Sequence, residues 1–211
     1  MFDIEYKGAN TVVISTKKST LVIDPKLSVA GGKDVLVKDA IEVATEPRLA
    51  VNGKDARLHI EGPGEYETGD FSIRGVRAVR HIDTEKDEPI STIYRIEVGE
   101  ARIALLGNIT GTLSDDQLEE LGIVDMLILP IGGGGLVPDA TSASHLVRQI
   151  DPKVVVPVHY ADDALTYEMP QDTFETFVKE LGAPVETVAK YKIKSVSALP
   201  QVLTVMQVTR S

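Results

Sequence analysis

The feature that most constrains the fold is a change in apolar pattern about halfway along the chain. The first hundred residues consist of short alternating or β-branched runs separated by turn residues, as in residues 2–6 and 11–16. Later runs, residues 124–129 and 154–156, are continuously apolar and alternate with helical patterns. Antiparallel strands followed by a strand–helix alternation predict a layered α/β (α+β) domain rather than a pure β-sandwich.

The expected elements are bounded by Gly, Pro, Asn and Asp, which favour turns. Expected strands cover residues 2–6, 11–16, 20–23, 57–60, 71–73, 78–81, 91–98, 102–106, 124–129, 154–156, 186–188 and 202–209. Expected helices cover residues 115–121, 140–150 and about 173–181, with Ser114 as a helix N-cap.

Composition limits the classes of function. With 211 residues and 43% apolar content, the chain can bury one substantial core, so we expect a single domain over 1–211. A net charge of −10 disfavours nucleic acid and anionic membrane surfaces as partners. There is no cysteine, which excludes thiolate metal sites, and no apolar run reaches the roughly 20 residues that span a bilayer. We expect a cytoplasmic protein.

Several segments, taken in order, resemble the metallo-β-lactamase superfamily, and specifically its branch similar to L-ascorbate-6-phosphate lactonase. They are residues 20–25 (TLVIDP), 64–73 (GEYETGDFSI), 105–108 (LLGN), 124–133 (VDMLILPIGG) and 151–160 (DPKVVVPVHY). The resemblance covers nearly the whole chain. It implies a four-layer αββα sandwich, here reduced in helices in its first half, with a site at one rim.

In that family, two zinc ions are held by a His-x-His-x-Asp-His loop, two later histidines and a bridging aspartate. Matched position by position, Glu46 and Arg48 replace the first two histidines, Ala50 the loop aspartate and Val51 the last histidine. Asn108 takes the place of the bridging aspartate. Only Glu46 can bind a cation, and Arg48 beside it repels one. The stretch from residue 46 to 56 is also too short for the helix that the family places there.

Two ligand positions survive in this alignment, His81 and His159, and two imidazoles alone make a poor zinc site. We expect His159 to be a buried, hydrogen-bonded histidine and His81 to begin a solvent-facing turn over residues 81–84. We also expect His81, Asn108 and His159 to meet at one rim. Asn108 or a backbone carbonyl should bond His159, and Arg48 should lie close enough to disfavour imidazolium.

Two further segments have structural explanations. Residues 132–135 are four glycines before a helix, and they lack the Lys-Ser/Thr of a P-loop, so a turn is favoured over an anion site. Residues 35–43 are rich in Val and Ile and offer a possible strand edge or apolar patch to a partner subunit.

The sequence therefore predicts a non-catalytic binding, regulatory or assembly protein without a metal cofactor and with an unspecified small-molecule ligand. The alternative is a hydrolase of the lactonase-like branch with a divergent or mononuclear site, acting on a phosphorylated or lactone-like substrate. It would use one metal, or a metal-free rim site, with His81, Asn108 and His159. The candidate zinc ligands are His81, His159 and Glu46. A third alternative is a homo-oligomeric structural module that associates through residues 35–43.

Overall fold

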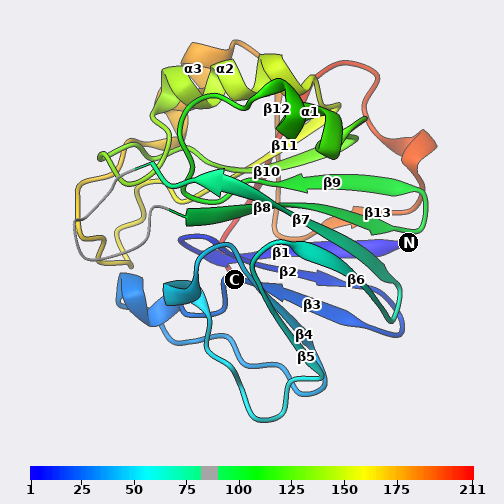
Figure 1. Cartoon of the computed structure of the whole chain (residues 1–211). Helices are drawn as coiled ribbons and strands as arrows, with labels where there is room; N and C mark the ends of the chain where they lie inside the picture. Colours follow the sequence, from blue (N-terminus) through cyan, green and yellow to red (C-terminus); the bar gives the residue numbers. More distant parts are fainter. Residues whose placement is uncertain (82–89) are drawn as a thin grey trace.

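Two β-sheets form the centre of the molecule (Figure 1). The computed structural model describes residues 1–81 and 90–211. In the described residues, the six-stranded sheet has the order β13-β1-β2-β3-β4-β5. Its strands are β1 (Phe2–Gly8), β2 (Thr11–Ser15), β3 (Thr20–Ile23), β4 (Ile41–Ala44), β5 (Leu58–Glu61) and β13 (Tyr191–Ile193).

The second sheet has eight strands in the described residues, in the order β12-β14-β11-β10-β9-β8-β7-β6. They are β6 (Gly64–Thr68), β7 (Phe71–Val79), β8 (Ile90–Val98), β9 (Ala101–Leu105), β10 (Met126–Pro130), β11 (Val154–Val158), β12 (Val185–Val188) and β14 (Thr204–Val208). Strands β6 to β9 pair antiparallel, whereas β9, β10, β11, β14 and β12 pair parallel. The predicted change from antiparallel strands to strand–helix alternation is thus confirmed within this sheet.

In residues 1–81 and 90–211, three α-helices are found, and they lie on the outer face of the eight-stranded sheet (Figure 1). They are α1 (Asp115–Leu121), α2 (Ala140–Ile150) and α3 (Phe174–Leu181), capped by the side chains of Ser114, Asp139 and Thr173. Each cap satisfies a backbone N–H that the first helical turn leaves unpaired. None of the helices in the described parts of the chain is long and apolar enough to cross a membrane.

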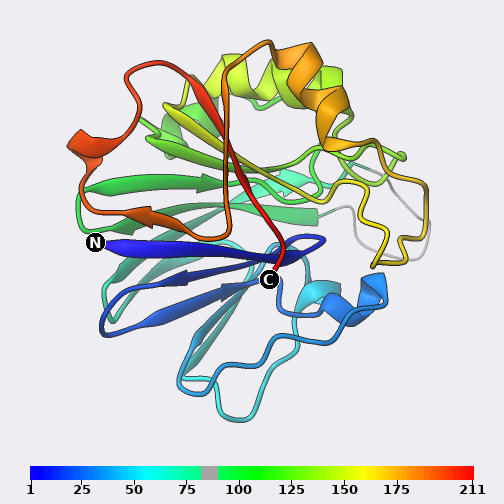
Figure 2. The same cartoon turned by 180° about the vertical axis from the view of Figure 1, so that it is seen from behind.

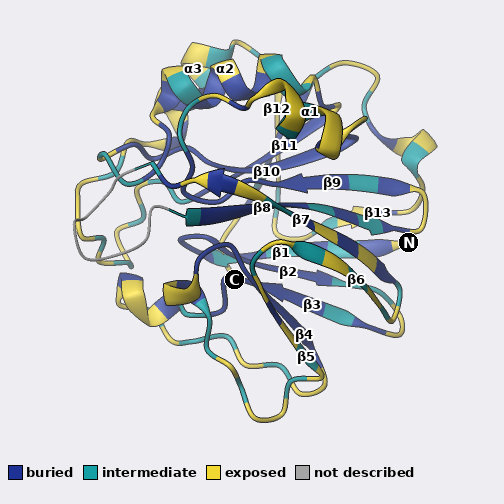
Figure 3. Cartoon of the chain, viewed as in Figure 1, coloured by how far each residue is buried: buried dark blue, intermediate teal, exposed yellow. Residues whose placement is uncertain are grey.

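Apolar side chains fill two layers of core. Figure 3 shows central strands of both sheets, such as β2 and β10, mostly as buried. Along β11, Val154 and Val156 face the other sheet, while Val155 faces the helices. The continuous apolar run follows from this position, because a strand covered on both faces needs apolar residues on both. The fold is the predicted metallo-β-lactamase type of sandwich.

The outer face of the six-stranded sheet is covered by coil and two 3-10 helices, η1 (Leu27–Ala30) and η2 (Pro47–Leu49), within the described residues. Val35 and Val37 pack against buried Val13 and Val22 there. The expected reduction in helices in the first half is therefore confirmed. The suggestion of a strand edge in residues 35–43 is wrong, because β4 lies between β3 and β5 and the preceding valines cover the sheet.

Candidate functional site

The ends of several strands bring polar side chains to one rim of the sandwich. Residues Thr45 and Glu46 follow β4, Arg80 follows β7, Asn108 comes after β9, and His159 follows β11. In layered α/β sheets, such strand ends open toward the ligand site. A continuous set of hydrogen bonds joins these groups.

Glu46 lies at the centre of the rim and is almost fully buried, with 2% exposure. Its Oε2 accepts a hydrogen bond from Arg48 Nε at 2.7 Å and lies 3.5 Å from Arg80 Nη1. Its Oε1 accepts from Asn108 Nδ2 at 2.7 Å. Glu46 is extended and Pro47 starts η2, which places Arg48 beside the carboxylate. Both carboxylate oxygens are thus occupied by protein donors.

A second part of the network runs from Asn108 to His159 through Asn10. Asn10 Nδ2 donates to Asn108 Oδ1 at 2.9 Å, and Asn10 Oδ1 lies 2.8 Å from His159 Nδ1. For the imidazole, our expectation that Asn108 or a backbone carbonyl bonds His159 is therefore wrong. A backbone carbonyl, that of Ala9, instead accepts from the backbone N–H of His159 at 2.8 Å. Asn10 lies in the tight turn between β1 and β2, and the sequence indicated only a turn there. Its amide lies between Asn108 and the His159 ring and forms a hydrogen bond with each of them.

His159 itself adopts the left-handed backbone region, with φ 49°, directly after β11. Its Nε2 is buried and has no hydrogen-bond partner among the described residues, and its ring packs 5.0 Å from the ring of Tyr167. Burial, together with the positive charge of Arg48, lowers the pKa of His159 to about 3. The imidazole is therefore neutral at physiological pH, and the predicted influence of Arg48 is confirmed.

His81 lies at the same rim, but its ring contacts the glycine loop and not Asn10. Its backbone N–H donates to the backbone oxygen of Asn108 at 2.9 Å. Its Nδ1 lies 3.2 Å from the backbone oxygen of Gly135, in the glycine loop. The structure thus brings His81, Asn108 and His159 together through the backbone and through Asn10. The rest of the turn expected over residues 81–84 lies outside the described residues.

A buried carboxyl group, Asp24, holds the rim residue Thr45 in place. Its Oδ1 accepts from Thr45 N at 2.7 Å, and its Oδ2 accepts from Thr45 Oγ1 at 2.8 Å. Burial raises the pKa of Asp24 to about 7 despite these hydrogen bonds, and the nearby Glu46 charge adds to the effect. Asp24 directly follows β3, so this contact fixes the loop after β4 against the neighbouring strand.

Two cavities meet at Arg48. One, of about 40 Å³, is lined by residues that include Asn108, His159 and Tyr167. It is close to the roughly 30 Å³ that one water molecule occupies. The other, of about 420 Å³, lies on the opposite side of Arg48. Arg48 is the residue common to their linings.

The segment from Ala161 to Asp172 covers the smaller cavity. Thr166 N donates to the backbone oxygen of Ala30 in η1 at 2.9 Å, and Leu165 packs against Leu27 and Ala30. Figures 1 and 2 show this yellow segment beside the blue η1 from both sides. The Tyr167 hydroxyl also donates to the backbone oxygen of Tyr160 at 2.9 Å. The rim is therefore closed near His159 and open near the larger cavity.

The rim side chains do not fit the dinuclear zinc centre that the resemblance implies. Glu46 is held by an arginine, Arg48 is a cation, and Asn108 directs its N–H donors toward Glu46. Among the described rim residues, His159 has a buried ring nitrogen, Nε2, without a hydrogen-bond partner. Across residues 1–81 and 90–211, no three His, Asp or Glu side chains cluster as metal ligands would.

Two further histidines have other surroundings. His59 Nδ1 lies 3.0 Å from Glu42 Oε2, and His145 is exposed on α2. The glycine loop turns back on itself, with Gly133 N donating to Pro138 O at 3.1 Å, as the structural interpretation predicted. Arg80, by contrast, was not identified from the sequence. A buried arginine at a strand end resembles any other strand residue until its partner is known.

Comparisons with known proteins agree with this geometry. A family profile described as a beta-lactamase superfamily domain matches residues 3–159. A Thermotoga maritima protein described as a Zn-dependent hydrolase of the metallo-beta-lactamase superfamily is 18% identical, with a TM-score of 0.74, covering 99% of this chain and 100% of that one. A metallo hydrolase of Ignicoccus hospitalis is 17% identical, with a TM-score of 0.61, covering 92% and 99%. The chain therefore belongs to the beta-lactamase superfamily.

Proposed function

We propose that this protein is a metal-free, non-catalytic member of its superfamily that binds a small molecule at the rim and acts in regulation or assembly. The observation that carries the proposal is the ion pair between Glu46 and Arg48, at 2.7 Å, in the positions of the first two zinc ligands. A guanidinium there supplies the positive charge that Glu46 needs, and it opposes the entry of a second cation.

The chemistry of the remaining groups supports the proposal. Zinc hydrolases depend on a metal-bound water whose pKa falls to about 7. Without a metal, a base with a pKa near the working pH is needed, and His159, with its pKa lowered to about 3, is a weak base at neutral pH. Asn108 does not ionise, and Glu46 already accepts from three side chains. Asp24 has a pKa of about 7, but both of its oxygens accept hydrogen bonds from Thr45.

Elemental analysis tests this proposal. Protein purified without chelator should contain far less than one zinc, iron or manganese per chain by plasma mass spectrometry. The same protein should not hydrolyse lactones, β-lactams or phosphodiesters faster than buffer. A turnover that disappears with EDTA and returns with zinc or manganese would refute the proposal.

A second candidate is a hydrolase with a divergent, mononuclear site, and the buried Nε2 of His159 favours it. This nitrogen carries a lone pair with no partner in the described residues, and neutral imidazole is a zinc ligand. The described relatives with similar folds include proteins named as metal hydrolases. Zinc-dependent turnover that is lost in His159→Gln and retained in His145→Gln would favour this candidate.

A further inference from the structure

We propose that the 420 Å³ rim cavity binds a small molecule through a terminal carboxylate or phosphate group, held by the guanidinium of Arg48. This inference rests on the proposed function, because it assigns the ligand class of the same metal-free rim.

The cavity has the size of a ligand site, since small-molecule pockets have volumes of about 300–1,000 Å³. It opens between η2, the turn after β5 and the start of β8. Its lining consists of Thr45, Glu46, Pro47, Arg48, Glu61, Gly62, Arg80, Ile90 and Thr92.

Arg48 is the group with donors to offer. Its Nε is bonded to Glu46, and within the described residues no hydrogen bond involves its two Nη atoms. Its side chain is 39% exposed, so the outer edge of the guanidinium is accessible. A planar guanidinium presents two parallel N–H groups to a carboxylate or phosphate, a geometry that gives short, charge-assisted hydrogen bonds.

The charge of the inner wall favours an anion. The guanidinium groups of Arg48 and Arg80 face the single carboxylate of Glu46, whose two oxygens are already occupied. A cation would meet two guanidiniums and no uncommitted oxygen of Glu46.

The Glu46 contact also fixes Arg48 before a ligand arrives. Holding Nε at 2.7 Å from a buried carboxylate restricts the rotation of the side chain and keeps the Nη atoms toward the cavities. A donor that is already ordered loses less conformational entropy on binding. Arg48 is therefore ordered before binding, as in a preformed oxyanion site, whereas an unpaired surface arginine would have to be ordered by the ligand.

One lining residue carries a charge that opposes an anionic ligand. This residue allows a test of whether the ligand is an anion or a cation. Glu61 is exposed at the end of β5 and forms part of the cavity wall. Its negative charge should weaken the binding of an anion. Neutralising it in Glu61→Gln should tighten binding, whereas the same change would weaken the binding of a cation.

Calorimetric titration of the full chain with succinate and with inorganic phosphate tests the inference, with sodium chloride at matched ionic strength as the reference. We expect saturable heat and a rise in Tm with succinate or phosphate, and neither with chloride. The two oxyanions distinguish a carboxylate ligand from a phosphate ligand. Metal-free protein that binds neither oxyanion would overturn this inference and leave the proposed function intact.

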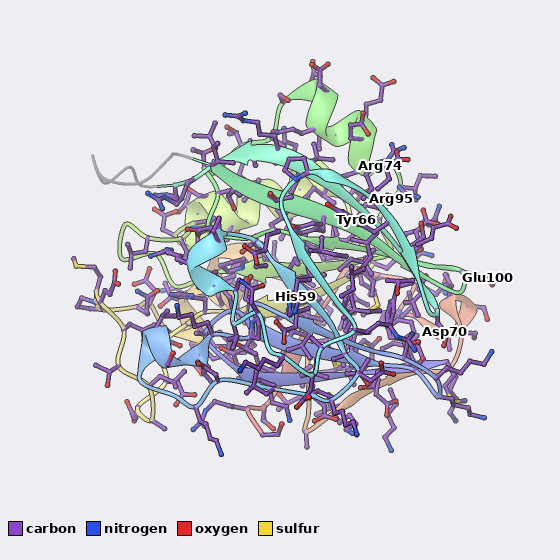
Figure 4. All side chains as sticks on the ribbon, turned by 60° about the horizontal axis from the view of Figure 1, so that its bottom comes forward. His59, Tyr66, Asp70, Arg74, Arg95 and Glu100 are labelled. Atoms are coloured by element: carbon purple, nitrogen blue, oxygen red, sulfur yellow. The ribbon has the colours of Figure 1, made fainter. Side chains whose placement is uncertain are left out.

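Variants locate the binding. Arg48→Lys keeps the charge but not the paired donors, so it should weaken binding about tenfold. Arg74→Lys is the matched control, because Arg74 is also partly exposed, at 45%, and paired with glutamates. Arg74 lies on β7 and does not line the 420 Å³ cavity, and Figure 4 shows it near Arg95 and Tyr66. Equal binding by wild type and Arg48→Lys, or weaker binding by Glu61→Gln, would overturn the inference. Stoichiometric zinc in the same samples would instead refute the proposed function.

Discussion

Glu46 and His159 do not form a hydrogen bond with each other, yet Glu46 determines which nitrogen of His159 carries the proton. An ionised carboxylate only accepts, so Asn108 must turn its Nδ2 toward Glu46 and its Oδ1 toward Asn10. Asn10 then turns its Oδ1 toward His159 Nδ1, which must be the N–H. The Nε2 of the neutral ring is left as the acceptor.

We call this chain of hydrogen bonds, from Glu46 through Asn108 and Asn10 to His159, the relay. It is directional because the nitrogen and the oxygen of each Asn side-chain amide both form a hydrogen bond. Reversing either Asn side chain would place two donors or two acceptors against each other. A buried polar group without its hydrogen bond costs about 1–3 kcal/mol, which keeps the whole chain in one orientation. Arg48 fixes the Glu46 end of this chain, because its Nε donates to Glu46 Oε2 at 2.7 Å.

The relay predicts that Glu46→Gln will change the tautomer of His159. A glutamine amide both donates and accepts, so it no longer forces Asn108 into one orientation. In ¹⁵N NMR spectra, wild type should show protonated Nδ1 and bare Nε2 in His159, and Glu46→Gln should show a mixture. His145→Gln serves to assign signals, because His145 is exposed on α2. A protonated Nε2 in wild type would contradict the relay.

Arg48→Met should destabilise the fold by about 2–4 kcal/mol, because the buried Glu46 carboxylate loses its ion pair with Arg48. Breaking a fully buried pair costs about 3–5 kcal/mol, and the 39% exposure of Arg48 lowers the expected value. Urea denaturation should show a lower midpoint with an unchanged m-value. Arg74→Met, at an exposed pair, should leave the midpoint where it was. Equal midpoints for both variants would contradict a structural role for the Glu46–Arg48 pair.

Much of the fold was predictable because its signals are local. The caps at Ser114 and Thr173 and the apolar run before Pro157 lie within a few residues of the elements they define. The missing zinc loop could also be identified, since it is a matter of residue types at given positions. The network that replaced it could not be predicted. Asn10 and Arg80 join the rim only through partners distant in sequence, and no short pattern encodes that meeting.

Two buried groups, Asp24 and His159, should change the stability of the fold with pH in opposite directions. Asp24 has a pKa of about 7 in the fold against an ordinary 3.8, so its contribution is lost as pH rises between those values. His159 has a pKa of about 3 against an ordinary 6.5, so its contribution is lost as pH falls through that window. Between about pH 4 and 6.5, the two slopes oppose each other.

Removing one of these two groups should therefore reveal the pH dependence of stability that the other group causes. Relative to wild type, Asp24→Asn should gain unfolding free energy as pH rises from about 4 to 7, by up to about 1.4 kcal/mol per pH unit. His159→Gln should show the reverse, losing stability relative to wild type as pH rises from about 3 to 6.5. Parallel curves of unfolding free energy against pH for wild type and both variants would show that neither pKa is shifted.

The final prediction concerns restoration of a metal site. Glu46 lies 2.7 Å from both Arg48 and Asn108, so these two positions face one point on the rim. In the double variant Arg48→His and Asn108→Asp, an imidazole and a second carboxylate would join Glu46 there. Without metal, the two carboxylates would repel each other and the variant should be less stable than wild type.

Zinc should reverse that loss. A metal that binds only the folded state stabilises it by about 2.7 kcal/mol at one hundred times its Kd, so the Tm of the double variant should rise with zinc and fall with EDTA. Wild type and Asn108→Asp alone should respond much less, because Arg48 still opposes a cation. If the double variant also fails to respond, the shortened loop at η2 rather than the side chains excludes the metal. A zinc response restricted to the double variant would trace the loss of the family's metal site to these two positions.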